Sequence, residues 1–539
     1  MAQSLPYAVS CKGGLNKNLN QFEMLAHPGI AATLENFEVD TDGGYRRING
    51  FAPYGGDDAT RPNSANAIIG LFVYADGVIA CSGTNIYFTL DGVTWLQINK
   101  ASVDASGDNY TAFTGRSAAA RTSQGQCTFT IYEGDSTYGE VIITDQSSAT
   151  KPFYFKMTGT GALSNRTYFA KEITVSGTVY PKTCIIHNRH LVVAGDTNNP
   201  NTIYYSGTDD IDDFTTTGSG SIKLDDKVIG IRSFRNDLII FCINSIYKLE
   251  NINIAASIAV TPITKNVGCI ANGSIQEFSG DLVFLSPDGV RTLAGTARIG
   301  DVELSSVSRP IQPVTNALAE GINNFITTSV VLRGKSQYRL FYTKSDLAAS
   351  ISKGFIGSLT TNGMAWSETK GIQARSITSG FNNDEVEESY HGDNDGFVYI
   401  HNSGNSFKHG ATEADILATY TTPNYDFGDH GTRKTINYVK ISVSPEGTVE
   451  PSLRVRYDYE DPTLPQPLDY SLGTIRTPAI FGTSVFGTSA YFGGTLDPTI
   501  RQAVQGNGHT TSFRIRSEDK NPPYAINGLY IDYTPANRR

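Results

Sequence analysis

The residues of this chain that could do chemistry stand in short, isolated groups. Gly334-Lys335-Ser336 has the last three letters of a phosphate-binding loop, but the upstream glycine is missing at the required spacing. Such a loop holds phosphate with the backbone N–H groups of a longer glycine-rich run. No dinucleotide-binding glycine pattern opens a helix either. The sequence therefore argues against packaging motors, helicases and dinucleotide-dependent enzymes.

Two groups have residue types that bind metals. His187 and His190 are three residues apart, but their segment has the pattern of a strand and has no third ligand nearby, which predicts a surface corner. Asp393-Asn394-Asp395-Gly396 begins like a calcium loop, but position twelve is Gly404 instead of glutamate. This segment predicts a tight turn between strands. We expect no metal site and no cofactor.

Two adjacent carboxylate pairs could suggest acid–base catalysis. They are Asp225-Asp226 and Glu387-Glu388. Catalysis of that kind needs two carboxyl groups that face each other, whereas neighbouring residues on a strand point to opposite faces. We interpret both pairs as solvated corners, find no catalytic residue, and expect that the protein is not an enzyme.

The composition suits a β protein rich in turns. Of 539 residues, 53 are glycine and only 18% are charged, while Tyr and Phe are abundant. The formal net charge of −10 argues against tight, non-specific DNA binding, which needs clustered positive charge. The six cysteines form no C-x-x-C pair, which favours reduced thiols and assembly in the cytoplasm. We see no signal peptide and no apolar stretch long enough to span a bilayer.

A recurring unit organises the first four-fifths of the chain. Polar or glycine corners that introduce apolar runs recur near residues 77, 140, 190, 237, 281, 337 and 396. Blades of a β-propeller recur at about 40–50 residues, whereas a series of β-sandwiches has no such period. Thr89–Trp95 is also similar to the Asp-box hairpin of sialidase-like propellers, with one residue missing between Asp91 and Gly92. The fold class we predict is all-β, with a propeller-like core of six or seven blades.

The domain limits follow from changes in this pattern. Residues 1–60 are predicted to form an N-terminal arm and first strands that close onto the core. Residues 61–420 form the propeller-like platform, with an insertion near 101–180, and residues 421–539 form a C-terminal β-sandwich-like region. Helix signals are few, and the clearest is Pro28–Phe37, where Ile30, Leu34 and Phe37 share one helical face.

Several stretches, in this order along the chain, resemble the tail nozzle proteins of short-tailed phages, the tail tubular protein B-like family of head-to-tail structural proteins. The stretches that carry the resemblance are Gly13–Asn16, Pro28–Ala31, Leu34–Phe37, Gly43–Gly50, His187–Leu191, Asn201–Ser206, Val267–Cys269, Phe284–Val290, Thr422–Gly428 and Ile531–Pro535 with Arg538-Arg539. The likeness covers most of the chain and is lowest over residues 101–180.

The resemblance implies a structural virion protein of the phage tail. It implies a homo-oligomeric ring, typically a hexamer, below the portal and adaptor ring, with tail fibres or spikes docked outside. DNA would pass through the lumen without specific binding. Two alternatives stay open: a tail-associated propeller that binds or hydrolyses glycans, and another tail part such as a hub or fibre base.

One low-complexity segment could contact a partner. Residues 481–494 repeat glycine and aromatic residues, which suggests an extended loop. We expect this loop to act as a lumen gate or a partner contact through Phe481, Val485, Phe486, Tyr491 and Phe492.

Overall fold

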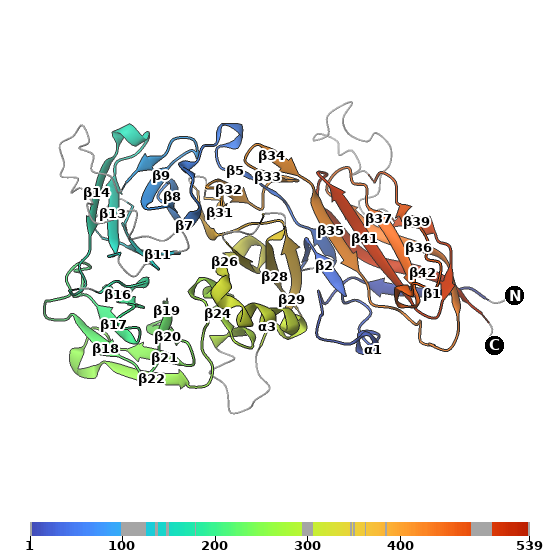
Figure 1. The fold of residues 1–539 in the computed structure, drawn as a ribbon, viewed down its shortest axis with the longest axis horizontal. Coiled ribbons are helices and arrows are strands. Elements are labelled where there is room, and N and C mark those ends of the chain that lie inside the picture. Colours follow the sequence, from blue (N-terminus) through green and yellow to red (C-terminus); the bar gives the residue numbers. More distant parts are fainter. Residues whose placement is uncertain are drawn as a thin grey trace.

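A computed structural model of the chain describes residues 3–41, 43–98, 126–134, 138–146, 150–177, 179–293, 306–344, 348, 351–361, 363–382, 385–475 and 499–536. With 51% of its residues in strands and 8% in helices, the protein is all-β, as predicted. The molecule is elongated, with a propeller at one end and a β-sandwich at the other (Figure 1). No helix in the described residues has the length and apolar character needed to cross a membrane.

Six small sheets stand in a ring and form the blades of the propeller (Figure 1). Their strands, blade by blade, are β7 (Ile68–Tyr74), β8 (Gly77–Ser82), β9 (Asn85–Thr89) and β10 (Leu96–Gln97); β11 (Cys127–Tyr132), β12 (Glu140–Asp145), β13 (Phe153–Thr158) and β14 (Thr167–Glu172); β15 (Thr183–His187), β16 (His190–Ala194), β17 (Thr202–Tyr205) and β18 (Gly220–Lys223); β19 (Val228–Phe234), β20 (Asp237–Cys242), β21 (Ile246–Glu250) and β22 (Ala259–Thr264); β23 (Gln276–Phe278), β24 (Asp281–Ser286) and β25 (Gly289–Thr292); and β30 (Ser376–Phe381), β31 (Glu387–Gly392), β32 (Val398–His401), β5 (Phe51–Pro53), β33 (Phe407–His409) and β34 (Thr412–Ala414).

A nine-stranded sheet joins the propeller to the sandwich. Its first four strands are β26 (Ile326–Leu332), β27 (Gln337–Thr343), β28 (Lys353–Thr360) and β29 (Gly363–Lys370). Strand β26 contacts both β23 and β30, so this part of the sheet lies in the ring between two blades. The sheet continues into the sandwich through β2 (Thr33–Glu35), β35 (Ile416–Thr421), β41 (Thr511–Asp519), β37 (Ser452–Tyr457) and β38 (Tyr470–Ser471).

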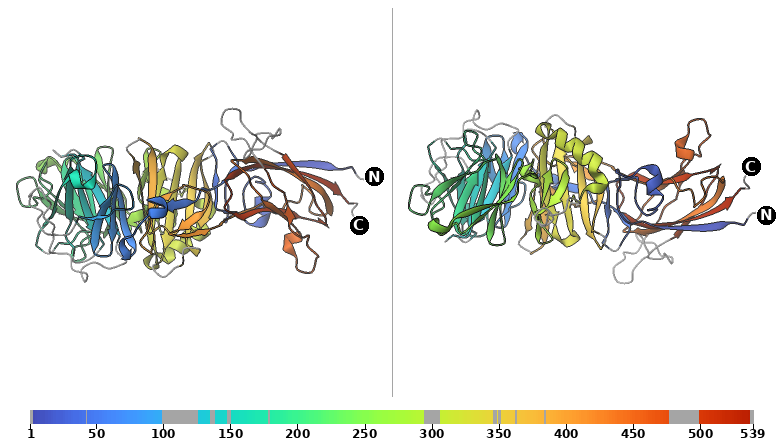
Figure 2. Two further views of the ribbon diagram at one scale, coloured as in Figure 1. Left: turned by 90° about the horizontal axis from the view of Figure 1, so that it is seen from above. Right: turned by 90° about the horizontal axis from the view of Figure 1, so that it is seen from below.

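The second sheet of the sandwich brings the two ends of the chain together. It contains β1 (Leu5–Ser10), β3 (Phe37–Val39), β4 (Tyr45–Arg47), β42 (Tyr524–Pro535), β36 (Lys434–Pro445), β39 (Thr499–Ala503) and β40 (Asn507–Gly508). Strand β1 pairs with β42 from Leu5 opposite Tyr533 onward. Both termini therefore lie at the end of the molecule that is farthest from the propeller (Figure 2). The predicted C-terminal sandwich is confirmed.

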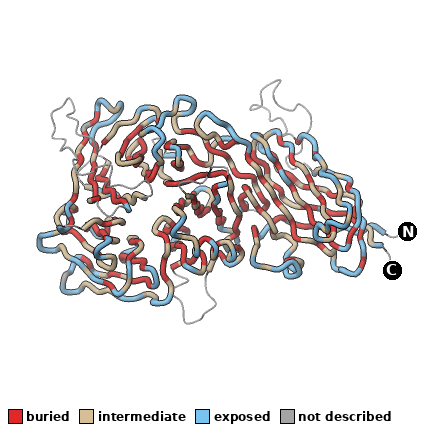
Figure 3. Tube along the Cα trace, viewed as in Figure 1, coloured by how far each residue is buried: buried red, intermediate tan, exposed pale blue. Residues whose placement is uncertain are grey.

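The corners predicted from the sequence mark the second strand of most blades. The strands that begin at or beside a predicted corner are β8, β12, β16, β20, β24 and β27, and the corner near 396 falls in the turn before β32. Buried apolar residues of neighbouring blades pack against one another in shared clusters. One example is the pair Phe241 and Phe284, whose ring centroids are 5.1 Å apart. Figure 3 shows where the buried residues lie along the strands of the ring.

The strands of residues 1–60 are divided among three sheets, and those of the predicted insertion form one blade. Within residues 1–60, β1, β3 and β4 belong to the sandwich, β2 belongs to the nine-stranded sheet, and β5 joins the blade of β30–β32. Within residues 101–180, strands β11–β14 form a complete blade.

The helix predicted over Pro28–Phe37 was wrong. Strand β2 and the first residue of β3 lie in its second half, and the only helix near it is the short α1 (Gln21–Met24), which precedes the segment. Asn36 lies between the two strands with a φ of 55°, which a continuous α-helix does not allow. One longer helix, α3 (Gln312–Glu320), packs against β25 and was not predicted.

Candidate functional site

The junction between the propeller and the sandwich is built around Asn36, between β2 and β3. Its side-chain amide donates to the carbonyl of Lys370 at the end of β29 (2.9 Å) and to that of Leu417 on β35 (2.8 Å). Its side-chain oxygen accepts from the Lys370 N–H at 2.9 Å. Since Asn36 is fully buried, this side chain holds the propeller part and the sandwich part of the nine-stranded sheet together.

A cluster of charged side chains lies next to Asn36. The carboxylate of Glu38, on β3, accepts from Arg46 of β4 (2.8 Å), from Lys335 (2.7 Å) and from Arg339 of β27 (2.9 Å). Gln337 adds a fourth donor at 3.1 Å. Glu38 and Arg46 belong to the sandwich, whereas Lys335, Gln337 and Arg339 belong to the propeller. We name Glu38, Arg46, Lys335 and Arg339 the junction cluster.

The charges of the junction cluster depend on one another. Burial by itself would raise the pKa of Glu38, but the positive charges of Arg339, Lys335 and Arg46 outweigh it and lower this pKa to about 2. Burial lowers the pKa of Lys335 and of Arg339, while Glu38 acts in the opposite direction. Arg46 also pairs with Glu446 at the surface (2.8 Å). Glu38 is thus the buried anion that compensates three cations from two lobes.

Two buried histidines extend the cluster into the propeller. Arg339 lies 3.1 Å from Nε2 of His401 on β32, and the Nδ1 atoms of His401 and His391 are 3.3 Å apart. Burial, together with His409, lowers the pKa of His391 to about 3. Burial, His391 and the cations lower the pKa of His401 well below its usual value. Both rings are therefore neutral at physiological pH.

The fragment that resembles a phosphate-binding loop is part of this junction. Lys335 belongs to a short turn (Arg333–Lys335) that precedes β27, and its ammonium group binds Glu38. The backbone N–H groups of Arg333 and Gly334 donate to the carboxylate of Glu387, at 3.1 and 3.3 Å. Carboxylates of the same chain thus occupy the donors that a nucleotide would need.

The two candidate histidines do not form a surface corner, so that prediction was wrong. His187 and His190 flank the β15–β16 turn and are only 2% and 1% exposed. His187 bonds Ser233 at 2.9 Å, and His190 bonds the carbonyl of Ser206 and the side chain of Asn253, both at 2.6 Å. Packing of the neighbouring blade over the turn buries them as satisfied structural histidines.

The two turn predictions are confirmed by their hydrogen bonds. The carboxylate of Asp393 accepts from the N–H groups of Asp395 (3.0 Å) and Phe397 (2.9 Å) in the turn between β31 and β32. The carboxylate of Asp91 accepts from Val93 (2.9 Å) and Thr94 (2.8 Å) in the hairpin between β9 and β10. Each carboxylate thus caps its own turn by accepting backbone N–H groups.

The adjacent carboxylate pairs are also used within the fold. Asp226 accepts from the N–H of Asn244 and the hydroxyl of Ser245, both at 2.8 Å, and Glu388 accepts from Tyr390. Within the described residues, no group of three or more His, Cys, Asp or Glu could hold a metal ion. The predicted gate or contact residues Phe481, Val485, Phe486, Tyr491 and Phe492 lie outside the described residues.

Sequence reasoning missed the junction cluster. Glu38 and Arg339 are 301 residues apart, so no spacing rule connects them. The available signal was the pair of adjacent arginines in Tyr45-Arg46-Arg47, which has the pattern of a strand. Arginine is seldom buried without a partner, so an arginine on a strand that packs in the core indicates a buried anion nearby.

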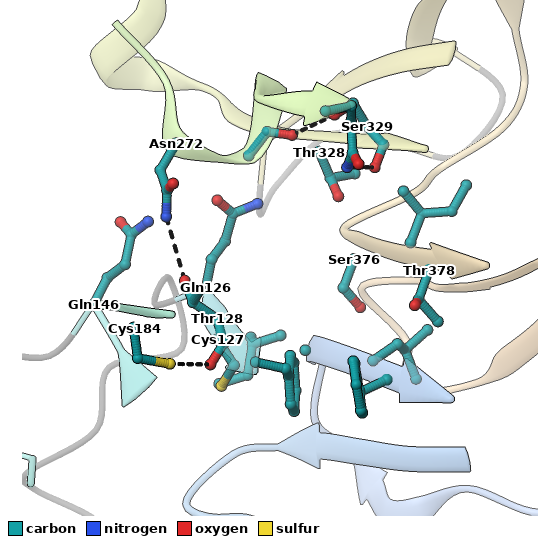
Figure 4. A pocket seen from close by; sticks show the side chains of 18 of the residues that line it. Gln126, Cys127, Thr128, Gln146, Cys184, Asn272, Thr328, Ser329, Ser376 and Thr378 are labelled. Atoms are coloured by element: carbon teal, nitrogen blue, oxygen red, sulfur yellow. Dashed lines mark hydrogen bonds between the residues drawn. The ribbon is translucent and has the colours of Figure 1, made fainter. Parts of the chain in front are cut away.

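The centre of the propeller holds a cavity of about 270 Å³. Side chains from β7, β11, β15, β19, β23, β26 and β30 line it, which are the strands nearest the ring centre. Gln126, Thr328, Ser376 and Thr378 surround the space, and Asn272 donates to Thr128 at 3.3 Å (Figure 4). Its polar lining residues are mostly uncharged.

Comparisons with known proteins add only distant structural likenesses. No known family model matches the chain, and no curated protein matches it. A computationally designed protein, Ika8, aligns at 9% identity and a TM-score of 0.33, over 63% of this chain and 98% of its own. An exo-beta-1,3-galactanase from Phanerochaete chrysosporium aligns at 9% identity and a TM-score of 0.27, over 90% of this chain and 99% of its own. An ancestral GH74 enzyme aligns at 10% identity and a TM-score of 0.37, over 72% of this chain and 51% of its own. At these scores the likenesses carry no functional argument.

Proposed function

We propose that the chain is a structural subunit of a phage tail that closes into a ring and acts as the nozzle below the portal and adaptor. The observation that carries the proposal is the ordered set of sequence stretches that resemble this family across most of the chain. The rigid junction supports it, because Asn36 and the junction cluster join the propeller and the sandwich into one elongated body. A ring that must withstand DNA passage needs a subunit without a free hinge.

The lumen of such a ring would lie between subunits. The propeller's own cavity of about 270 Å³ is below the usual size of a pocket for a drug-sized molecule, so a DNA duplex does not fit through it. The excess of acidic residues would limit adhesion of DNA to the wall. Ring closure requires a heterologous interface whose rotation closes, with two different faces of each subunit in contact.

Electron microscopy of the purified protein tests this proposal. The full chain is imaged by negative stain, alone and mixed with the portal–adaptor assembly of the same phage. A closed ring with an open centre, formed alone or on the adaptor, is the expected result. A protein that stays monomeric under both conditions would contradict the proposal, and binding to a glycan array would then support the glycan-binding alternative.

A further inference from the structure

Arg232, on β19, is the charged side chain of the propeller's central cavity. Among the described residues that line this cavity, it is the only one with a formal charge. The other polar lining groups are amides, hydroxyls and thiols, and they include Gln126, Gln146, Asn272 and Thr328. The cavity therefore carries one positive charge that its own walls do not neutralise.

The guanidinium of Arg232 binds only neutral acceptors. It donates to the carbonyl of Ile231 at 2.8 Å, and to the side chain of Asn272, the carbonyl of Asn272 and the carbonyl of Ile275 at 3.3–3.4 Å. The last three distances are beyond the usual range for N–H···O bonds. In the part of the chain that the structure describes, no carboxylate forms an ion pair with Arg232. Loss of hydration lowers its pKa, which marks the charge as poorly solvated.

A poorly hydrated cation without a counter-ion is unfavourable, and a bound anion removes this cost. In the junction cluster, by contrast, the buried cations have a carboxylate, as Arg339 has Glu38. The planar guanidinium fork matches the two oxygens of a phosphate or carboxylate. We propose that the central cavity of the propeller binds a small oxyanion, a phosphate or a carboxylate group, through Arg232.

The rest of the cavity suits such a ligand. Its volume of about 270 Å³ has room for a small anion and several waters. The side chains of Gln146, Thr328 and Thr378 line it and make no side-chain hydrogen bond within the described residues. They offer N–H and O–H donors from two blades and from β26 for the remaining oxygens of the anion. This binding site is independent of ring formation.

Calorimetric titration of the full chain tests the proposal with two probes, inorganic phosphate and acetate, at constant chloride concentration. We expect saturable binding of at least one probe, and the stronger one identifies the preferred oxyanion. Arg232→Gln should weaken that binding at least tenfold. The control Arg235→Gln changes an exposed arginine three residues away and should bind as the unchanged protein does.

Thermal unfolding provides a second measurement that does not depend on one variant. At the same anion concentration, the bound anion should raise the Tm of the unchanged protein by more than the Tm of Arg232→Gln. If Arg232→Gln does not fold, Thr128→Asp places a carboxylate in the cavity wall beside Asn272 and should also weaken binding, because its negative charge repels the anion. Absence of binding for both probes would overturn the proposal. Equal affinity of the unchanged protein and the folded Arg232 or Thr128 variant would also overturn it.

Discussion

The carboxylate of Glu38 on the sandwich lies 2.9 Å from the guanidinium of Arg339 on the propeller. Both side chains are almost completely buried, at 4% and 1% exposure. A buried charge whose partner is removed is strongly destabilising, whereas the intact pair adds little net stability. The pair therefore fixes how the two lobes meet, because any other arrangement would leave one of these charges alone.

Replacing Glu38 with glutamine should destabilise the protein by about 3–5 kcal/mol, because three cations lose their buried anion. Guanidinium-induced unfolding, followed by tryptophan fluorescence, measures this change. Trp366 on β29 lies in the core that the nine-stranded sheet shares with the sandwich, so it reports on the junction. The matched control is Glu446→Gln, which removes the exposed partner of Arg46 and should cost about 1 kcal/mol or less. Equal losses for the two variants would contradict the role of Glu38.

Two substitutions of Asn36 should separate the contribution of its hydrogen bonds from that of its strained backbone. Asn36→Gly removes three buried hydrogen bonds and should cost about 3 kcal/mol. Asn36→Ala loses the same bonds but keeps a Cβ at a φ of 55°, so it should cost about 1 kcal/mol more than the glycine variant, which has no Cβ. Urea unfolding of both variants gives the two free energies of unfolding. If alanine is tolerated as well as glycine, the strained backbone at this position has no energetic role.

The neutral histidines predict a loss of stability in acid. The folded pKa of His391 is about 3 and the unfolded value is about 6.5, so the unfolded chain binds the extra proton between these limits. Stability is therefore present above pH 6.5 and falls by about 1.4 kcal/mol per pH unit below it. Burial also lowers the pKa of His401 and that of His409, so these two rings act in the same direction. Asp393, whose pKa burial raises to about 6, opposes the trend between about pH 4 and 6.

The contribution of His391 is isolated by comparing slopes. The free energy of unfolding is measured between pH 6 and 5, above the range where Glu38 titrates. His391→Gln should reduce the slope by roughly 1.4 kcal/mol per pH unit, while the exposed control His27→Gln should leave it unchanged. An unchanged slope in His391→Gln would show that this ring already binds a proton in the folded state.

Local patterns predicted the propeller because each blade is local in the sequence. A corner such as Asp237 or Asp281 and the apolar run after it lie within one hairpin, and the period of these corners is visible along the chain. The pairing of β1 with β42 joins opposite ends of the chain, and no local pattern indicates it. The segment Pro28–Phe37 was misread because two short strands separated by Asn36 produce the same apolar spacing as a helix turn.

The difference between local and long-range contacts also explains which candidate sites could be predicted from the sequence. The caps of Asp91 and Asp393 depend on residues two to four positions away, so the sequence predicted them. Burial of His187 and His190 depends on packing of the next blade, through Ser233 and Asn253, and the sequence pattern does not contain it. The role of Arg232 was missed for the same reason. The cavity that it lines is formed by seven strands from most of the propeller.

The two capped turns give a final prediction, because the same turn chemistry stands in different surroundings. Asp91 is exposed, so water can replace the carboxylate for the N–H groups of Val93 and Thr94, and Asp91→Ala should cost about 1 kcal/mol. Asp393 is buried, and its second oxygen also accepts from the hydroxyl of Tyr399 at 2.7 Å. Asp393→Ala leaves three donors without an acceptor and should cost about 3 kcal/mol or more. Thermal unfolding of both variants compares them directly. A cost for Asp91→Ala that equals the cost for Asp393→Ala would show that local turn geometry, and not burial, sets the value of these caps.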